Sequence, residues 1–284
     1  MKLIECPRDA MQGIEEFIPT EVKAKYINLL LDVGFDTIDF GSFVSSKAIP
    51  QLRDTADVLK RLNLENTNSK LLSIVANMQG AENVCRFEQI DYMGYPFSIS
   101  ETFQQRNTNS SIEKSLIKVE EINNLANSFN KDLVVYISMA FGNPYNDPWS
   151  IDIIAEWTEK LANVGIKIIS FADTIGVSNK ENIEYVFKNI VPEFTFIEFG
   201  AHLHTSPELW SEKVSAAYEN GCLRFDGAIY GYGGCPMAGN EMVGNMPTEK
   251  VIDFLTFDKK LNLDLDFEAL ELALEYSKIV FKDK

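Results

Sequence analysis

Two histidines one residue apart are the feature of this sequence that most suggests chemistry. His202 and His204 lie in the stretch GAHLHTS, and they are the only histidines among 284 residues. On a β-strand, residues i and i+2 point to the same face, so both imidazoles would face one way. Such a pair is as typical of two hydrogen-bonded histidines near a loop as of a metal site. The residues that the fold brings beside them must decide between these readings.

Other polar and ionisable residues recur at the ends of β-rich runs. They include Arg8 and Asp9, Asp39 and Ser42, Ser170, Asp173 and Thr174. A glycine-rich stretch, GYGGCPMAGN, follows the last such run and holds Cys235 between Gly234 and Pro236. Its glycines would let this stretch take unusual dihedral angles and move as a lid. A cysteine held there fits a reactive thiol better than a core residue.

Eight β-rich runs alternate along the chain with segments of helical periodicity. The runs are residues 2–7, 36–42, 70–75, 87–93, 132–140, 166–173, 194–204 and 222–228. The clearest helical segments are 20–34, 111–130 and 147–165, the last with Asp147 as a candidate cap and Gly165 at its end. Strands that alternate with helices predict parallel βαβ units.

Eight such units in about 250 residues match the size of a (β/α)₈ barrel. We therefore predict an α/β fold, a TIM barrel, that forms a single catalytic domain over residues 1–284. The barrel is expected at about 2–256, with the glycine-rich lid loop after strand 8. An extra C-terminal helix at about 266–281 belongs to an extension at about 264–284. An open doubly wound sheet is the alternative, which the lack of a GxGxxG after the first strand disfavours.

A barrel of this type has its active site at the carboxyl ends of the strands. Because the barrel closes strand 8 onto strand 1, Asp9 would lie close to His202 and His204. Two imidazoles and a carboxylate suit a divalent first-row ion, and added oxygen ligands would let Mg²⁺ or Mn²⁺ bind. Zinc would more often recruit a cysteine or a third histidine.

The composition excludes several classes of partner. The net charge of −16 argues against non-specific binding to nucleic acids and against anionic membranes. No stretch approaches the roughly 20 apolar residues of a membrane span. The first residues show no apolar signal region, so we expect a cytoplasmic protein. Four cysteines without a CxxC do not predict a disulfide framework.

Several motifs occur in an order that resembles a known family. They are PRDAMQG, IDFGSFVSSKAIPQ, SISETFQQRNTNSSIEKS, ISMAFGNPY, SFADTIGV, AHLH and GYGGCPMAGNEMVGNMPTE. Together they resemble the hydroxymethylglutaryl-CoA lyases of the DRE-TIM metallolyase superfamily, from about residue 4 to residue 256. PRD, DTIG and HxH are shared across the superfamily, whereas SFVSxKxxPQ and GGCP are more specific to the lyases.

The resemblance implies a (β/α)₈ barrel that holds Mg²⁺ or Mn²⁺ and cleaves 3-hydroxy-3-methylglutaryl-CoA to acetyl-CoA and acetoacetate. It implies an acyl-CoA substrate and a homodimer. The implied cation ligands are Asp9, His202, His204 and Asn245. Arg8 would stabilise the developing enolate, Cys235 would act from the lid, and Asp39, Asp173 and His202 are the candidate proton carriers. The substrate would contact Arg8, Gln12, Ser42, Lys47, Ser170 and Thr174, with Lys47 and Arg106 as partners for CoA phosphates.

The sequence departs from the lyase pattern at two informative places. Asp39 stands where the lyases carry glutamate, so its carboxylate is one methylene shorter. This leaves open another 3-hydroxyacyl-CoA as the substrate. The stretch between GGCP and GN is one residue longer than in some relatives, which makes Asn240 the alternative to Asn245 as the fourth ligand.

Four other functions fit parts of the pattern. A Claisen-type condensing enzyme would usually extend well beyond the barrel. An aldolase acting on a 4-hydroxy-2-oxo acid would not need GGCP. An Fe(II) oxygenase uses similar ligands, but no second cosubstrate motif is visible. A fourth hypothesis is a barrel that binds the metal but no longer catalyses a reaction, and the replacement of glutamate by Asp39 leaves this hypothesis open.

Overall fold

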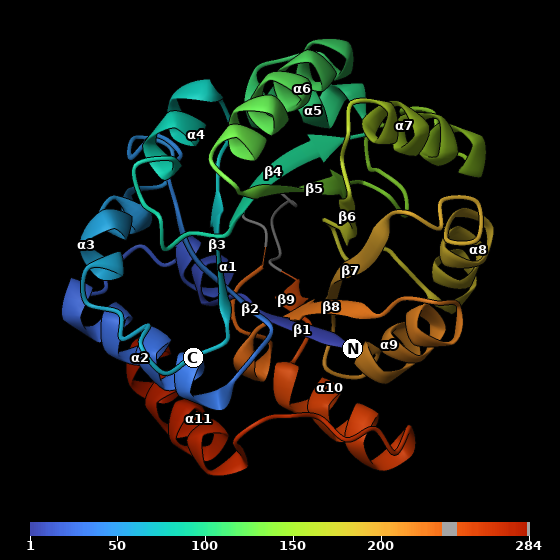
Figure 1. Cartoon of the computed structure of the whole chain (residues 1–284). Helices are drawn as coiled ribbons and strands as arrows, with labels where there is room; N and C mark the ends of the chain where they lie inside the picture. The colour runs from blue at the N-terminus through green and yellow to red at the C-terminus, as the bar shows by residue number, and fades with distance from the viewer. Residues whose placement is uncertain (235–242, 283–284) are drawn as a thin grey trace.

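The computed structural model describes residues 1–234 and 243–282. Eight parallel strands form the centre of the fold: β1 (Lys2–Glu5), β2 (Thr37–Ser42), β3 (Lys70–Ile74), β4 (Tyr92–Ser98), β5 (Asp132–Ser138), β6 (Ile168–Asp173), β7 (Glu198–Thr205) and β8 (Arg224–Gly227). Each strand pairs with the next along the chain, and β8 pairs with β1, which closes the barrel (Figure 1). The predicted TIM barrel is therefore confirmed, and the open sheet is excluded.

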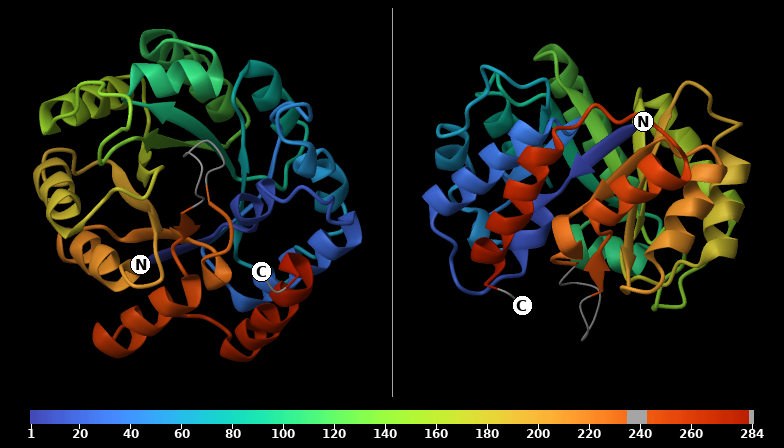
Figure 2. Two further views of the ribbon diagram at one scale, coloured as in Figure 1. Left: turned by 180° about the vertical axis from the view of Figure 1, so that it is seen from behind. Right: turned by 90° about the horizontal axis from the view of Figure 1, so that it is seen from below.

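Helices surround the barrel. They are α1 (Pro7–Gln12), α2 (Thr20–Val33), α3 (Thr55–Leu59), α4 (Met78–Val84), α5 (Glu101–Thr108), α6 (Ile112–Ser128), α7 (Ile151–Asn163), α8 (Lys180–Ile190), α9 (Trp210–Glu219), α10 (Thr248–Asp253) and α11 (Phe267–Phe281). The exception is α1, which lies at the barrel rim inside the ring of the other helices (Figure 1). Figure 2 shows the helices from two further sides. Among the described residues, no helix is long and apolar enough to cross a membrane.

Two separate apolar regions support the barrel. The larger lies between the outer face of the strands and the helices, where the rings of Phe171 and Phe199 stack at 5.3 Å. The smaller lies inside the barrel and includes Leu72, Val134 and Ile168. Because parallel strands in this fold are covered on both faces, they appear in the sequence as nearly continuous apolar runs. Polar residues at their carboxyl ends therefore stand out.

One predicted strand is wrong in its position. The run 87–93 was expected, but β4 begins at Tyr92 and ends at Ser98. Gly94 and Pro96 disfavour a strand by local propensity, and tertiary packing overrides that preference. A Cβ on Gly94 would lie 2.5 Å from Ile74 Cδ1, so a larger residue would displace that side chain where β4 pairs with β3.

One predicted helix cap is also wrong. Asp147 was the candidate cap of the helix in 147–165, whereas α7 begins after Ser150, whose side chain accepts from the Ile153 amide at 3.3 Å. The Asp147 carboxylate instead accepts from the Ser100 hydroxyl and from the amide and hydroxyl of Thr102. It thus fixes the start of α5, a helix that lines the pocket described below.

The predicted C-terminal helix is confirmed as α11, with Asp266 as its cap. It packs against α2 (Figure 2). The rings of Tyr26 and Phe281 meet edge to face there, with centroids 5.9 Å apart. The strand β9 (Gly244–Asn245) is short and pairs antiparallel with the end of β7. This pairing returns the chain after strand 8 to the rim of the barrel.

Glu5 is a fully buried carboxyl group that ties β1 to the segment after β8. It accepts from the Ile229 amide at 2.9 Å and from the Thr248 hydroxyl. Burial raises the pKa of Glu5 to about 8, although these two hydrogen bonds lower it. The folded protein therefore keeps a proton on Glu5 at pH values where the unfolded chain, with a pKa near 4.5, has lost it.

We predict that Glu5→Gln removes a pH-dependent loss of stability. Between pH 5 and 8 the unfolded chain releases the Glu5 proton and the folded protein does not, so the free energy of unfolding falls by on the order of a few kcal/mol. A glutamine amide can keep both contacts without ionising. Urea unfolding should therefore show a smaller fall between pH 5 and 8 in the variant. The exposed Glu65→Gln is the control, and an equal fall in Glu5→Gln and wild type would contradict the prediction.

Candidate active site

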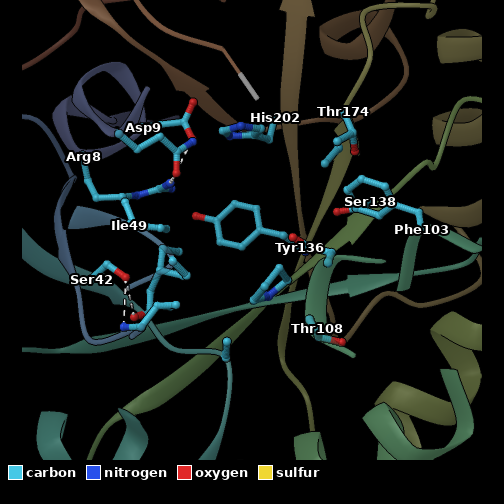
Figure 3. A pocket seen from close by; sticks show the side chains of 18 of the residues that line it. Arg8, Asp9, Ser42, Ile49, Phe103, Thr108, Tyr136, Ser138, Thr174 and His202 are labelled. Carbon is cyan, nitrogen blue, oxygen red and sulfur yellow. Dashed lines mark hydrogen bonds and ion pairs between the residues drawn. The ribbon is translucent and has the colours of Figure 1, made fainter. Parts of the chain in front are cut away.

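A pocket of about 400 Å³ opens at the carboxyl ends of the strands (Figure 3). Arg8, Asp9 and His202 lie along one side of it, and Tyr136 projects between them and Ser138. The remaining wall is largely apolar and comes from the β2 loop, β3, β4 and α5: Val44, Ala48, Ile49, Ile74, Ala76, Pro96 and Phe103. The pocket thus has a charged side and an apolar side.

Arg8 lies between two carboxylates on the charged side. It is the second residue of α1, directly after Pro7, so the chain turns from β1 into a helix at the barrel rim. Its Nε donates to both oxygens of Asp39, at 3.0 and 3.2 Å, and its Nη1 donates to Asp9 Oδ1 at 2.8 Å. Burial lowers the pKa of Arg8, but the charges of Asp39 and Asp9 outweigh it and raise that pKa.

Asp39 lies behind Arg8 and does not line the pocket. Its side chain is buried within β2 and accepts hydrogen bonds from the Arg8 guanidinium. Burial raises the pKa of Asp39 to about 6, and Arg8 opposes that rise. The geometry therefore makes Asp39 the residue that holds Arg8 in place, while its catalytic role as a proton carrier stays a prediction.

Asp9 is buried and surrounded by donors. Oδ1 accepts from Arg8 and from Gln12 Nε2 at 2.7 Å, and Oδ2 accepts from Asn245 Nδ2 at 2.8 Å. Burial alone would raise the pKa of Asp9, but Arg8, the two histidines and Asn245 together lower it to about 2. Asp9 is therefore a carboxylate at neutral pH, as a cation ligand must be.

His202 and His204 both point into the barrel from β7, with their ring centroids 5.3 Å apart. His202 Nδ1 lies 3.1 Å from Asp226 Oδ2, and His204 Nδ1 lies 3.2 Å from the Thr174 carbonyl oxygen. A ring that donates through Nδ1 leaves the lone pair of its Nε2 free. The Nε2 of His204 is buried and has no hydrogen-bond partner among the described residues.

These residues fit a divalent cation. One ligand atom each from Asp9, His202 and His204 lies within 4.8 Å of the others. A buried carboxylate with two imidazoles is a donor set that Mn²⁺ accepts, and Mg²⁺ when further oxygens complete it. The Nε2 of His204 is buried without a hydrogen-bond partner among the described residues, which costs free energy. A bound cation would remove this cost by accepting the lone pair of that nitrogen.

Asn245 is brought to the same place by the pairing of β9 with β7, in which it stands opposite His204. Its Nδ2 donates to Asp9 and to the Tyr232 carbonyl oxygen, both at 2.8 Å. The side-chain oxygen of Asn245 remains the atom that could ligate. Its role as the fourth ligand stays a prediction, and the alternative, Asn240, lies outside the described residues.

The predicted substrate residues divide into two groups. Arg8, Gln12, Ser42 and Thr174 line the pocket. Ser170 does not: it is buried deeper in the barrel, with its hydroxyl 3.1 Å from where a Cβ of Gly200 would lie. Lys47 is exposed on the loop after β2, next to the lining residues Ala48 and Ile49. The geometry does not place Ser170 at the substrate.

Asp173 was expected to serve in catalysis, and the structure gives it other partners. Its carboxylate accepts from the amides of Val177 and Ser178, from the Ser178 hydroxyl and from Lys213 Nζ at 3.0 Å. It does not line the pocket, so its catalytic role stays a prediction without geometric support. Lys213 also donates to the His204 carbonyl oxygen, so Asp173 helps to hold the end of β7. Cys235 lies outside the described residues.

Sequence reasoning missed three residues around His202. Asp226 hydrogen-bonds its ring, Tyr136 meets it edge to face at 5.6 Å, and Arg224 is buried below it in the barrel. The signal was present in LRFDGA, because charged residues two apart in a buried strand must both face the barrel interior. That stretch was read only as a strand.

Comparison with known proteins gives the family. A model of the HMGL-like family matches residues 3–276. The hydroxymethylglutaryl-CoA lyase YngG of Bacillus subtilis is 33% identical over 261 residues, which cover 92% of this chain and 86% of the relative. The chain belongs to the HMGL-like family. The mitochondrial hydroxymethylglutaryl-CoA lyase of Rattus norvegicus is 31% identical, over 90% of this chain and 78% of the relative.

Solved structures agree with this assignment. The HMG-CoA lyase of Brucella melitensis superposes with a TM-score of 0.90 at 26% identity, over 99% of both chains. An HMG-CoA lyase of Acinetobacter baumannii in complex with coenzyme A and 3-methylmalate gives 0.89 at 27% identity, over 99% of this chain and 91% of the other. The resemblance read from the motifs is thereby confirmed, and the chain is an enzyme of a lyase family.

Proposed function

We propose that this HMGL-like protein is a divalent-cation-dependent lyase that cleaves 3-hydroxy-3-methylglutaryl-CoA to acetyl-CoA and acetoacetate. The observation that carries the proposal is the convergence of Asp9, His202 and His204 beside Arg8 in the pocket at the carboxyl ends of the strands. The relatives named above as lyases for this substrate support it, as does the coenzyme A in one of the solved structures.

The reaction is a retro-Claisen cleavage. The 3-hydroxyl loses its proton, the C2–C3 bond breaks, and its electron pair passes to the thioester as an enolate, which is then protonated at carbon. Mg²⁺ or Mn²⁺ held by Asp9, His202, His204 and Asn245 would lower the pKa of the hydroxyl and fix its orientation. The remaining steps need charge stabilisation and proton transfer from the chain itself.

Arg8 supplies the charge stabilisation. Of its five N–H donors, the hydrogen bonds to Asp39, Asp9 and Gln12 engage four, and one Nη2 hydrogen has no partner among the described residues. Asp39 holds the guanidinium that carries this donor, and Arg8 lines the pocket. A fixed donor aimed at a developing oxyanion is worth roughly 3 kcal/mol.

Proton transfer is shared between the barrel and the lid. Of the three candidate carriers, only His202 lines the pocket. An imidazole bound to a cation through one nitrogen is a poor base, so we propose His202 as a proton shuttle and not as the first base that removes the hydroxyl proton. Cys235 is proposed, on the family resemblance, to protonate the enolate carbon. Arg106, exposed at the pocket wall over the ring of Tyr145, and Lys47 are the proposed contacts for CoA phosphates.

The proposal includes three further features of the enzyme. It acts as a single catalytic domain over residues 1–284, as a homodimer, in the cytoplasm. The geometry of the site supports neither the dimer nor the cytoplasmic location. The dimer is proposed on the family resemblance, and the location on the sequence.

The direct test is to incubate purified protein with 3-hydroxy-3-methylglutaryl-CoA and Mg²⁺ or Mn²⁺ and to measure acetoacetate. We expect acetoacetate from the wild type and its loss on chelation. His204→Ala, which removes one proposed ligand, should not recover activity when the ion is restored. Absence of acetoacetate from metal-loaded wild type would sink the proposed substrate.

The Asp39→Glu variant tests whether the site is built for the shorter carboxylate. Because Asp39 is buried in contact with Arg8, an added methylene displaces the guanidinium by about 1 Å, which can cost on the order of 100-fold in rate. We expect kcat to fall with KM little changed, as for an interaction made only in the transition state.

The matched control is Asp36→Glu, the same change at the residue before β2, whose carboxylate accepts from the Thr37 hydroxyl; it should leave kcat unchanged. A higher kcat in Asp39→Glu would show instead that aspartate detunes the site for this substrate, and would favour another 3-hydroxyacyl-CoA.

A further inference from the structure

Asp226 is a buried carboxylate that touches the proposed metal site without belonging to it. The pairing of β7 with β8 places Asp226 directly opposite His202. Its Oδ2 lies 3.1 Å from His202 Nδ1, and its side chain has no exposed surface. It does not line the pocket, so any effect that it has on the reaction must pass through His202.

The chemistry of this contact is directional. A neutral imidazole carries one N–H, on either Nδ1 or Nε2, and an ionised carboxylate only accepts hydrogen bonds. With Asp226 beside Nδ1, the proton must sit on Nδ1, and the lone pair must sit on Nε2. Only a nitrogen with a lone pair can bind a cation.

We propose that Asp226 is a positioning residue that fixes the tautomer and ring orientation of His202, so that Nε2 faces Asp9 and His204 as a ligand. This proposal rests on the metal site of the proposed function. His204 reaches the same state by a different device, because its Nδ1 faces the Thr174 carbonyl oxygen, which also only accepts. The two histidines therefore depend on separate partners, and they can be perturbed one at a time.

A buried cationic side chain accompanies Asp226 on β8. Arg224 lies two residues earlier on β8, on the same inward-facing side, and is fully buried. Asp226 Oδ1 and the Nε and Nη2 of Arg224 have no hydrogen-bond partners among the described residues. Because these buried polar atoms have no hydrogen-bond partner, a nearby group of opposite charge stabilises them. Arg224 therefore compensates the charge of Asp226 from the side away from the metal site.

The chain offers a clean experiment, because it has only two histidines. Long-range ¹H–¹⁵N spectra of metal-free protein labelled at histidine nitrogens distinguish Nδ1–H from Nε2–H rings, at a pH where both rings are neutral. In the wild type we expect both rings to carry Nδ1–H. In Asp226→Asn, the amide turns a donor towards His202 Nδ1, and we expect Nε2–H at His202 with His204 unchanged.

Metal binding gives the second readout. Loss of a carboxylate that orients a histidine ligand typically lowers metal affinity by about 10-fold to 100-fold. Calorimetric titration with Mn²⁺ should show a loss of this size in Asp226→Asn. Glu198→Gln is the matched control, since it neutralises a carboxylate at the start of β7 that contacts Arg224 and Lys2 and not His202. It should change neither the His202 signature nor the affinity.

The outcomes separate this proposal from the proposed function. An Nε2–H signature at His202 in the wild type overturns it, and this result needs no variant to fold. Unchanged spectra and Mn²⁺ affinity in a folded Asp226→Asn also overturn it, as does an equal loss in Glu198→Gln. Protein that binds Mn²⁺ and shows the expected tautomers, but releases no acetoacetate, would leave the role of Asp226 intact and refute the proposed substrate.

Discussion

The salt bridge between Arg8 and Asp9 is the interaction on which the site depends. A carboxylate buried with two imidazoles would normally gain a proton, because burial disfavours its charged form. Arg8 reverses this, and the pKa of Asp9 falls to about 2. Arg8 itself is held by Asp39 on its other side. A permanently charged cation ligand and a preorganised donor therefore come from adjacent residues.

The barrel supplies the geometry that these charges need. Closure of β8 onto β1 brings the first residues of α1 to β7 and β8, more than 190 residues later in the chain. The short strand β9 then returns Asn245 to His204. Each histidine is oriented by an acceptor from a neighbouring strand end, Asp226 for one and the Thr174 carbonyl for the other. The site is rigid because strands and the short helix α1, and not loops, carry its proposed ligands.

The barrel and the metal-binding group could be predicted from the sequence because both depend on patterns that are local in the chain. Alternating strands and helices give the fold, and the i, i+2 spacing gives the shared face of His202 and His204. Local patterns could not show what a side chain meets across the barrel. The sequence alone treats Asp39 and Asp173 as free carboxylates, whereas in the structure Asp39 forms an ion pair with Arg8 and Asp173 forms one with Lys213. The role of Asp226 was missed because its partner, His202, lies on another strand. The bounds of β4 were wrong because tertiary packing around Gly94 overrides the low local propensity of this segment for a strand.

The central claim is that Asp9, His202 and His204 together hold a divalent cation. Its most direct test is a crystal grown with Mn²⁺ and measured for anomalous scattering near the manganese absorption edge. We predict one strong peak in direct contact with Asp9 and with the Nε2 atoms of both histidines. A peak elsewhere on the protein, with these three side chains hydrogen-bonded only to one another or to water, would contradict it.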